Sequence, residues 1–273
     1  MKKFLKMMLV CVLSTALIAC SHTKTEEKTT FVVGMECACA PFNWQTNVKS
    51  DTTVSLGNAG YADGYDVQIA KKIADELGLE LVIKKIAWDG LPVALESGEI
   101  DAIIAGMTAN EEREEGIDFT TPYYDSDGMV MIVRKDSEES TFTDIQQFSG
   151  KNIVGQKSTS YDDVIDQIQG VNHVTPKATY PEMVVALQQG DVDGIPAEMA
   201  IAEGVLAANK DLTVVKFDEG KGFKCDTTVS IGLKEGTRGT EFFNQVQAIL
   251  DKISTDERKQ IMSEAVTRQP VEE

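Results

Sequence analysis

The sequence predicts an α/β protein made of two similar lobes that face one ligand. The first observation is an internal repeat: residues 93–105 align without gaps on residues 185–197, with seven identical positions out of thirteen. Each copy has the pattern of an amphipathic helix, a glycine stop and a buried strand. The second observation is the alternation of strands and helices, which favours mostly parallel sheets flanked by helices. A chance likeness between two common helix–strand units is the alternative explanation of the repeat.

In the first half of the chain, apolar periodicity and glycine stops predict strands and helices in alternation. A helix that opens at Gly64 carries apolar residues at helical spacing and ends at Gly78. Farther on, Thr108 with Glu111 three residues later predicts a capping box, which places Arg113 in the first turn of a helix with unpaired amides. The other expected elements are strands at 31–35, 79–86, 100–105 and 128–133 and a helix at 89–97.

The second half of the chain continues the same alternation. Thr179 and Glu182, with Pro181 between them, predict a second capping box at the start of a helix that runs to Gln189. The last long helix has apolar residues at helical spacing from Phe242 to Ile253, which indicates core packing rather than a cofactor site. The remaining expected elements are strands at 151–155, 192–197 and 228–233 and helices at 161–168 and 199–208.

The first 19 residues have the pattern of a signal peptide. Three early lysines precede the apolar run 7–19, whose thirteen residues fall short of the roughly 20 that span a bilayer. The run ends in Leu-Ile-Ala followed by Cys20, which resembles a bacterial lipobox and implies acylation, including palmitate, at Cys20. Residues 20–30 are polar and are expected to form a flexible tether. This predicts an extracytoplasmic lipoprotein anchored at the cell membrane or outer envelope; an ordinary secretory signal is the alternative.

Composition excludes several other classes of protein. The formal charge of −18 at pH 7 disfavours nucleic-acid binding, which needs a basic surface. The two histidines have no cysteine at ligand spacing, so we expect no metal site and no cofactor. Cys37 and Cys39 lie two residues apart on an expected strand and point the same way. Buried thiols are favoured, and a bridge from Cys225 to one of them is the alternative.

The polar and aromatic residues near the expected strand ends suit a free amino acid. The carboxylate of such a ligand requires a guanidinium fork and free amides, and its ammonium requires a carboxylate. Arg113 and Thr108, with the loop from Ser158 to Ser160, can supply the first requirement, and Glu198 can supply the second. Aromatic walls are available from Phe42, Trp44 and Trp88. Taken alone, Arg113 could belong to a solvated helix face and Trp88 to a core.

These residues lie in stretches that resemble the extracellular solute-binding proteins of polar amino-acid ABC transporters (family 3). The resemblance extends from Phe31 to Ala265 and is most specific in five stretches: Ala-Pro-Phe at 40–42, Gly-Tyr-Asp-Val at 64–67, Trp-Asp-Gly-Leu at 88–91, residues 106–113 and residues 117–124. It implies a type II periplasmic-binding-protein-like fold with two hinge strands. Lobe one would comprise 31–125 plus 230–273, lobe two 130–224, and the hinges would lie near 126–130 and 224–230.

The resemblance also implies roles for individual residues. Arg113 would bind the ligand carboxylate with Thr108, Thr159 and the backbone of Gly106, and Trp88 would form an aromatic wall. Glu36 would meet a side-chain nitrogen of the ligand. Two departures from the family pattern are Cys39, at a position that is commonly aromatic, and Glu198, which replaces an aspartate. Phe42 or Trp44 could replace the missing aromatic wall.

The expected function follows from these roles. Because two carboxylates face one guanidinium, we expect a cationic amino acid such as arginine or lysine, with glutamine next. The protein would be a monomer that delivers its ligand to an ABC permease powered by an ATPase. The alternatives are an extracellular dehydratase-like enzyme, a sensor lobe and a surface adhesin. No residue pattern pairs a nucleophile with a base, so we expect no catalysis.

Overall fold

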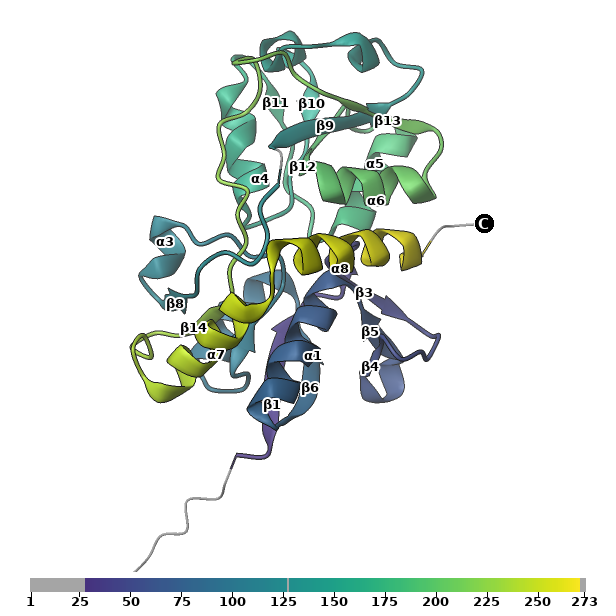
Figure 1. Ribbon diagram of the computed structural model, residues 1–273. Coiled ribbons are helices and arrows are strands. Elements are labelled where there is room, and N and C mark those ends of the chain that lie inside the picture. Colours follow the sequence, from purple (N-terminus) through teal and green to yellow (C-terminus); the bar gives the residue numbers. More distant parts are fainter. Residues whose placement is uncertain (1–27, 127, 271–273) are drawn as a thin grey trace, which may run out of the picture.

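The computed structural model describes residues 28–126 and 128–270. The predicted signal peptide, the acylated Cys20 and most of the tether therefore lie outside the described residues. Figure 1 shows two bodies of sheet and helix stacked one above the other, with several chain segments crossing between them. In the described part of the chain, no helix is long and apolar enough to cross a membrane.

The first lobe is built on a five-stranded sheet. Its strands lie in the order β6 (Glu80–Lys85), β1 (Thr30–Met35), β7 (Ala102–Ile103), β14 (Gly232–Lys234) and β8 (Ile117–Phe119). Strand β1 pairs in parallel with β6 and β7, as expected from the strand–helix alternation, whereas β14 is antiparallel to β7 and β8. The antiparallel β14 comes from the C-terminal part of the chain, which returns to this lobe after the second lobe is complete.

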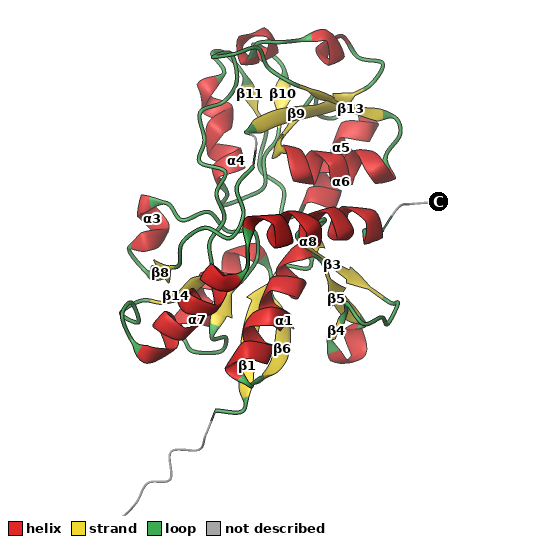
Figure 2. Cartoon of the chain, viewed as in Figure 1, coloured by secondary structure: helices red, strands yellow, loops and turns green. Residues whose placement is uncertain are grey.

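Helices α1 (Tyr65–Leu77), α2 (Leu91–Glu96) and α7 (Glu241–Lys252) belong to the first lobe, and Figure 2 shows α1 and α7 there. Helix α1 buries its apolar face and ends at Gly78, which has the left-handed φ of 69° that a glycine stop requires. The expected last long helix, with apolar residues from Phe242 to Ile253, is α7, and a further helix that the sequence did not predict, α8 (Thr255–Arg268), follows it. Helix α8 lies along the junction between the two lobes in Figure 1.

A small antiparallel sheet, which the sequence did not predict, lies beside the first lobe. Its order is β2 (Ala38–Cys39), β3 (Asn43–Thr46), β5 (Tyr61–Asp63) and β4 (Val54–Ser55). The expectation that Cys37 and Cys39 share one strand is wrong, because Cys37 has a φ of 56° in the bend between β1 and β2. Cys37, Cys39 and Cys225 are all free thiols, so the alternative of a bridge to Cys225 is not realised.

The second lobe holds the strands β12 (Ile195–Glu198), β9 (Met129–Arg134) and β13 (Leu212–Val215), together with the pair β10 (Asn152–Ile153) and β11 (Asn172–His173). Parallel pairing occurs between β10 and β11 and at the bridge from Ile153 to Gly194. Strand β9 is antiparallel to both of its neighbours because it enters from the crossing segment. The helices are α4 (Ser160–Asp163), α5 (Tyr180–Gln189) and α6 (Met199–Ala208).

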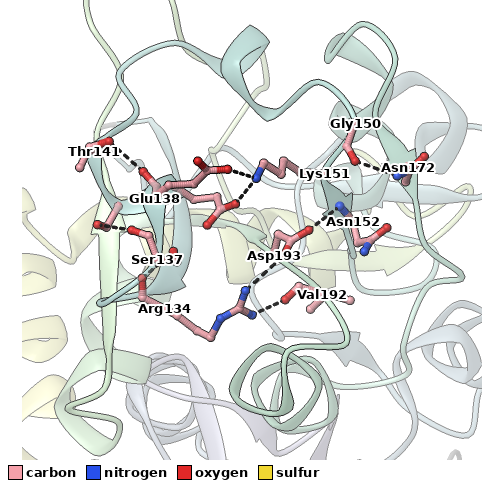
Figure 3. Close-up of polar contacts among 12 residues, drawn as sticks. Arg134, Ser137, Glu138, Thr141, Gly150, Lys151, Asn152, Asn172, Val192 and Asp193 are labelled. Atoms are coloured by element: carbon pink, nitrogen blue, oxygen red, sulfur yellow. Dashed lines mark hydrogen bonds and ion pairs between the residues drawn. The ribbon is translucent and has the colours of Figure 1, made fainter.

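Arg134 at the end of β9 ties several of these elements together (Figure 3). Its Nη1 donates to the carbonyls of Leu187 at 2.8 Å and Val192 at 2.5 Å, and its Nη2 lies 3.1 Å from Asp193 Oδ1. The other oxygen of Asp193 accepts from the amide of Asn152 at 2.9 Å. The start of β10 and the end of α5 are thereby connected through one guanidinium and one carboxylate.

Two chain segments cross between the lobes side by side. Tyr124 and Val229 form an antiparallel bridge, in which the Val229 amide donates to the Tyr124 carbonyl at 2.9 Å. The hydroxyl of Thr227 donates to the carbonyl of Ser126 at 3.3 Å. Paired crossing strands of this kind restrict the relative motion of two lobes to a hinge.

Candidate functional site

A pocket lies between the two lobes, at the ends of the strands that the repeat predicted. Strand β7 ends at Ile103, three residues before Gly106, and β12 ends at Glu198. The free space that a water-sized sphere can reach inside the pocket is about 30 Å³. Eight of the nine predicted site residues line it: Glu36, Phe42, Trp88, Gly106, Thr108, Arg113, Thr159 and Glu198. Ser158 is not among the lining residues, and it takes part through its backbone carbonyl.

Arg113 lies in the first turn of the short helix α3 (Glu111–Glu114). The predicted cap is wrong, because Asn110 Oδ1, not Thr108, accepts from the Arg113 amide at 2.9 Å. Thr108 instead accepts a 2.8 Å hydrogen bond at its carbonyl from Arg113 Nη1. Burial lowers the pKa of the guanidinium, which nevertheless remains charged. A carboxylate in the pocket would meet this positive charge.

Trp88 and Arg113 both reach across to the second lobe through Ser158. The Trp88 Nε1 donates to the Ser158 carbonyl at 2.9 Å, and Arg113 Nη2 donates to the same oxygen at 3.2 Å. The guanidinium carbon lies 5.4 Å from the centre of the Trp88 ring, within cation–π range. Ser158 has a φ of 61°, so its backbone is held in the left-handed region at this contact. These bonds hold the two lobes together at the pocket.

Glu198 is the carboxylate of the second lobe, with a relative exposure of only 1%. The hydroxyl of Tyr161 donates to its Oε1 at 2.8 Å, while its Oε2 is buried without a hydrogen-bond partner. Burial raises the pKa of Glu198 to about 8, although Tyr161 and the nearby Ser126 oppose the rise. Oε2 thus lacks a donor, which is unfavourable for a buried acceptor.

Glu36 is the second carboxylate of the pocket and also lies almost entirely buried. The amide nitrogen of Gln156, from the opposite lobe, donates to its two oxygens at 3.1 and 3.0 Å and to the carbonyl of Ala178 at 2.9 Å. Burial raises the pKa of Glu36, and the bond from Gln156 opposes this rise. Gln156 thus forms an interlobe contact at the end of the pocket that the ligand side chain would reach.

A buried network behind the pocket positions Gly106. The Gly106 amide donates to the hydroxyl oxygen of Tyr123 at 3.1 Å, and that hydroxyl donates to Asp66 Oδ1 at 2.6 Å. Asn43 donates to the other oxygen of Asp66 at 2.8 Å. Burial raises the pKa of Asp66 to about 6 against these two hydrogen bonds. Gly106 has a φ of 64°, a left-handed conformation that favours glycine, whereas a Cβ there would be in ordinary contact with the ring of Phe42 at 3.5 Å.

Sequence reasoning missed several residues of the pocket. Gln156 directly follows the expected strand 151–155, but no local pattern marks it as the partner of Glu36, which is 120 positions away. Tyr161 and Tyr180 fit ordinary helix starts, and the pairing of Tyr161 with Glu198 spans 37 positions. Trp44, which was expected as an aromatic wall, instead lines a separate groove beside β3. Phe42 lines the pocket.

The arrangement of charges suits binding, and the described residues contain no cluster of three or more side chains that could hold a metal ion. The two-lobed α/β body has a guanidinium and two carboxyl groups at one interlobe pocket, an arrangement suited to holding a small charged solute. The model of the bacterial extracellular solute-binding proteins, family 3, matches residues 32–266, and this chain belongs to that family. The predicted fold and family resemblance are thereby confirmed.

Named relatives and solved structures agree with this assignment. The chain is 32% identical to a probable histidine-binding protein of Campylobacter jejuni, over 82% of this chain and 85% of that one. It is 28% identical to an L-cystine-binding protein of Escherichia coli, over 88% and 84% of the two chains. The arginine-bound form of truncated ArgBP from T. maritima has a TM-score of 0.69 at 28% identity, covering 82% of this chain and 96% of that one. The names of these proteins describe the binding of an amino acid and no enzymatic activity.

Proposed function

We propose that this protein captures a polar amino acid outside the cytoplasm and delivers it to an ABC permease driven by an ATPase. The observation that carries the proposal is the pair formed by Arg113 and Glu198 at one pocket. The first residue offers a guanidinium to a carboxylate, and the second offers the partnerless Oε2 to an ammonium. The names of the relatives support an amino acid as the ligand class.

Within this class, a cationic amino acid such as arginine or lysine balances the charges best, and glutamine is second. Once the ligand ammonium and carboxylate neutralise Glu198 and Arg113, the buried Glu36 carries the remaining negative charge. A positively charged side chain neutralises it, since an unpaired buried carboxylate is costly. A side-chain amide could only replace the neutral bond that Gln156 already donates.

The ligand would dock on the first lobe at Arg113 and Trp88 and be covered by Thr159 and Glu198 of the second. We propose lobe boundaries at 31–125 plus 230–273 and 130–224, with hinges near 126–130 and 224–230. Paired crossing segments at Tyr124 and Val229 support a hinge there. Closure is driven only by contacts that the ligand makes in the closed form.

The protein is further proposed to be a monomer held at the membrane through acylated Cys20. The family assignment supports the extracytoplasmic location, and the lipobox-like Leu-Ile-Ala-Cys supports the anchor. Mass spectrometry of the processed N-terminus would detect acyl chains on Cys20, and a chain released in soluble form by signal cleavage alone would refute the anchor.

The ligand class is tested by calorimetry of the purified full chain against the twenty standard amino acids. We expect heat of binding, in the micromolar range or tighter, for arginine or lysine, with glutamine weaker. Absence of binding to every amino acid would refute the proposed function. Tight binding of an acidic amino acid in preference to all others would instead refute the charge argument built on Glu36.

A further inference from the structure

The side chain of Gln269, directly after helix α8, is buried at the junction of the two lobes without a hydrogen bond. It is 4% exposed, and neither its Nε2 nor its Oε1 has a partner. Among the described residues, no other side chain has two polar atoms that are both buried without partners. A buried carboxamide that forms no hydrogen bond is unfavourable, because water would otherwise solvate both of its ends.

Helix α8 is attached to the first lobe, so Gln269 belongs to that lobe. Arg258 Nη1 donates to the carbonyl of Pro122 at 2.9 Å. At the end of α8, Arg268 Nη2 lies 3.3 Å from Oδ1 of Asp63 in strand β5. In Figure 1 the C-terminal end of α8 lies well to one side of the segments that cross between the lobes. Gln269 is thus placed away from the crossing segments.

The carboxamide of Gln269 lies against the second lobe at Gly204 of helix α6. A Cβ added to Gly204 would lie 2.6 Å from Gln269 Oε1 and 3.1 Å from the backbone oxygen of Ala40, which belongs to the first lobe. Glycine therefore lets α6 approach the first lobe closely. It has no side chain that could bond to the carboxamide, and the neighbouring α6 residues Ile201 and Val205 are apolar. The burial of Gln269 thus depends on contact between the lobes.

We propose that Gln269 opposes closure of the two lobes and so lowers the affinity of the protein for its amino acid. This inference rests on the proposed function. Separation of the lobes removes α6 from Gln269 and lets water reach its carboxamide, so the unfavourable burial exists only in the closed form. A ligand that binds the closed form must offset this cost, and its apparent affinity falls by the corresponding factor. Without a ligand, the open form is favoured.

Replacing Gln269 by methionine tests the proposal. Gln269→Met keeps the length of the side chain and can pack against Gly204, but it has no amide to bury. Calorimetry of the purified full chain against the twenty standard amino acids measures the affinity. We expect the variant to bind the amino acid that the native protein binds, and to bind it about tenfold more tightly. An affinity equal to that of the native protein, or weaker, would overturn the proposal.

Two further variants separate the loss of the buried amide from other effects. Gln260→Met is the matched control, because Gln260 is an exposed residue of α8 whose carboxamide already donates to Glu264 at 2.9 Å. This variant should keep the native affinity. Gln269→Ala removes the buried amide without placing a long side chain against Gly204, so it should also bind more tightly than the native protein. An equal gain in affinity from Gln260→Met would show a general effect of methionine on α8 and would contradict the proposal.

Small-angle X-ray scattering of the ligand-free protein measures closure without a ligand. We expect Gln269→Met to have a smaller radius of gyration than the native protein and Gln260→Met, because more of its molecules are closed. Equal radii for all three proteins would refute the role of Gln269. If no amino acid binds the native protein, the proposed function is wrong, and scattering still decides the role of Gln269. If an amino acid binds the native protein and Gln269→Met equally well, only the role of Gln269 is wrong.

Discussion

Replacing Glu198 by glutamine should stabilise the protein at alkaline pH and weaken its binding of an amino acid. The side chain is 1% exposed, and burial raises its pKa from the ordinary 4.5 to about 8. In the unfolded chain the group ionises near 4.5. Between these two values unfolding releases a proton, so the stability of the native protein falls as pH rises from about 4.5 to about 8 and is constant above that.

The size of the effect follows from the same two values. The interval from 4.5 to about 8 corresponds to roughly 5 kcal/mol of unfavourable burial for the fully ionised carboxylate. Glutamine has nearly the same shape and cannot ionise, and its carbonyl can still accept from Tyr161. Because its amide nitrogen also needs a partner, we expect a net gain of a few kcal/mol at pH 8.5. That corresponds to roughly 5–10 °C in Tm for a chain of this size.

Thermal unfolding of Glu198→Gln and of the native protein at pH 5 and pH 8.5 measures this difference. We expect a small gap in Tm at pH 5 and a large one at pH 8.5. Asp66, whose pKa burial also raises, is present in both proteins and cancels in the comparison. Glu203→Gln is the control, since Glu203 is an exposed glutamate of helix α6, which follows Glu198 directly.

The same variant should bind an amino acid about tenfold to a hundredfold more weakly, because a neutral acceptor replaces a charged partner of the ammonium. Calorimetry measures the affinity. An equal Tm gap at both pH values would show that Glu198 does not titrate abnormally, and unchanged affinity would remove it from the ammonium site. The first result would refute the raised pKa of Glu198, and the second would refute its role in binding the ligand.

Two further substitutions have defined outcomes. Arg113→Ala removes the guanidinium that donates to the carbonyls of Thr108 and Ser158, so calorimetry should show amino-acid affinity reduced by about 2–5 kcal/mol; an unchanged Kd would exclude Arg113 from the site. His173→Gln removes an imidazole whose two ring nitrogens lie 2.9 Å from carboxylates of Asp162 and Asp166. Burial lowers the pKa of His173, but these two carboxylates outweigh burial and raise it above 6.5. The stabilisation by charged His173 is therefore complete below pH 6.5 and is lost as pH rises through the raised pKa. The Tm of the variant should thus differ from that of the native protein more at pH 5.5 than at pH 9. A Tm difference independent of pH would contradict an imidazolium that is hydrogen-bonded to both carboxylates.

Local patterns in the sequence predicted the elements that are specified locally. Helices α1 and α5 end at Gly78 and Gly190, both with positive φ, because apolar periodicity and a glycine stop are properties of consecutive residues. The predicted capping box of α5 is half confirmed. The Thr179 hydroxyl accepts from the Glu182 amide, but the Glu182 carboxylate accepts from the amide of Ala178 and not from that of Thr179. A one-residue difference in the amide that Glu182 accepts from changes the capping hydrogen bonds and leaves the start of the helix unchanged.

Helix α8 has a local helix-start signal, but its lack of apolar periodicity prevented its prediction. The segment is mostly polar and buries only Ile261, Met262 and Ala265, so apolar periodicity gave no reason to expect it. Ser254 nevertheless accepts from the Glu257 amide at 3.2 Å, which is the start signal of a helix. In contrast, the small sheet of β2 to β5 has strands of two to four residues, which are too short for any alternation to be recognised.

By itself, the sequence determined the alternation of strands and helices, the repeat with charged residues beyond its strands, and the residue types that suit an amino acid. Only the tertiary structure decided which of those residues meet. Glu36 and Gln156 are 120 positions apart, and the burial that leaves one oxygen of Glu198 without a partner depends on packing by both lobes. Periodicity is a property of neighbours along the chain, whereas burial and pKa depend on everything that surrounds a group in space. The chemistry of this pocket therefore depends on the packing of both lobes together, although the strands and helices of each lobe could be predicted from the sequence.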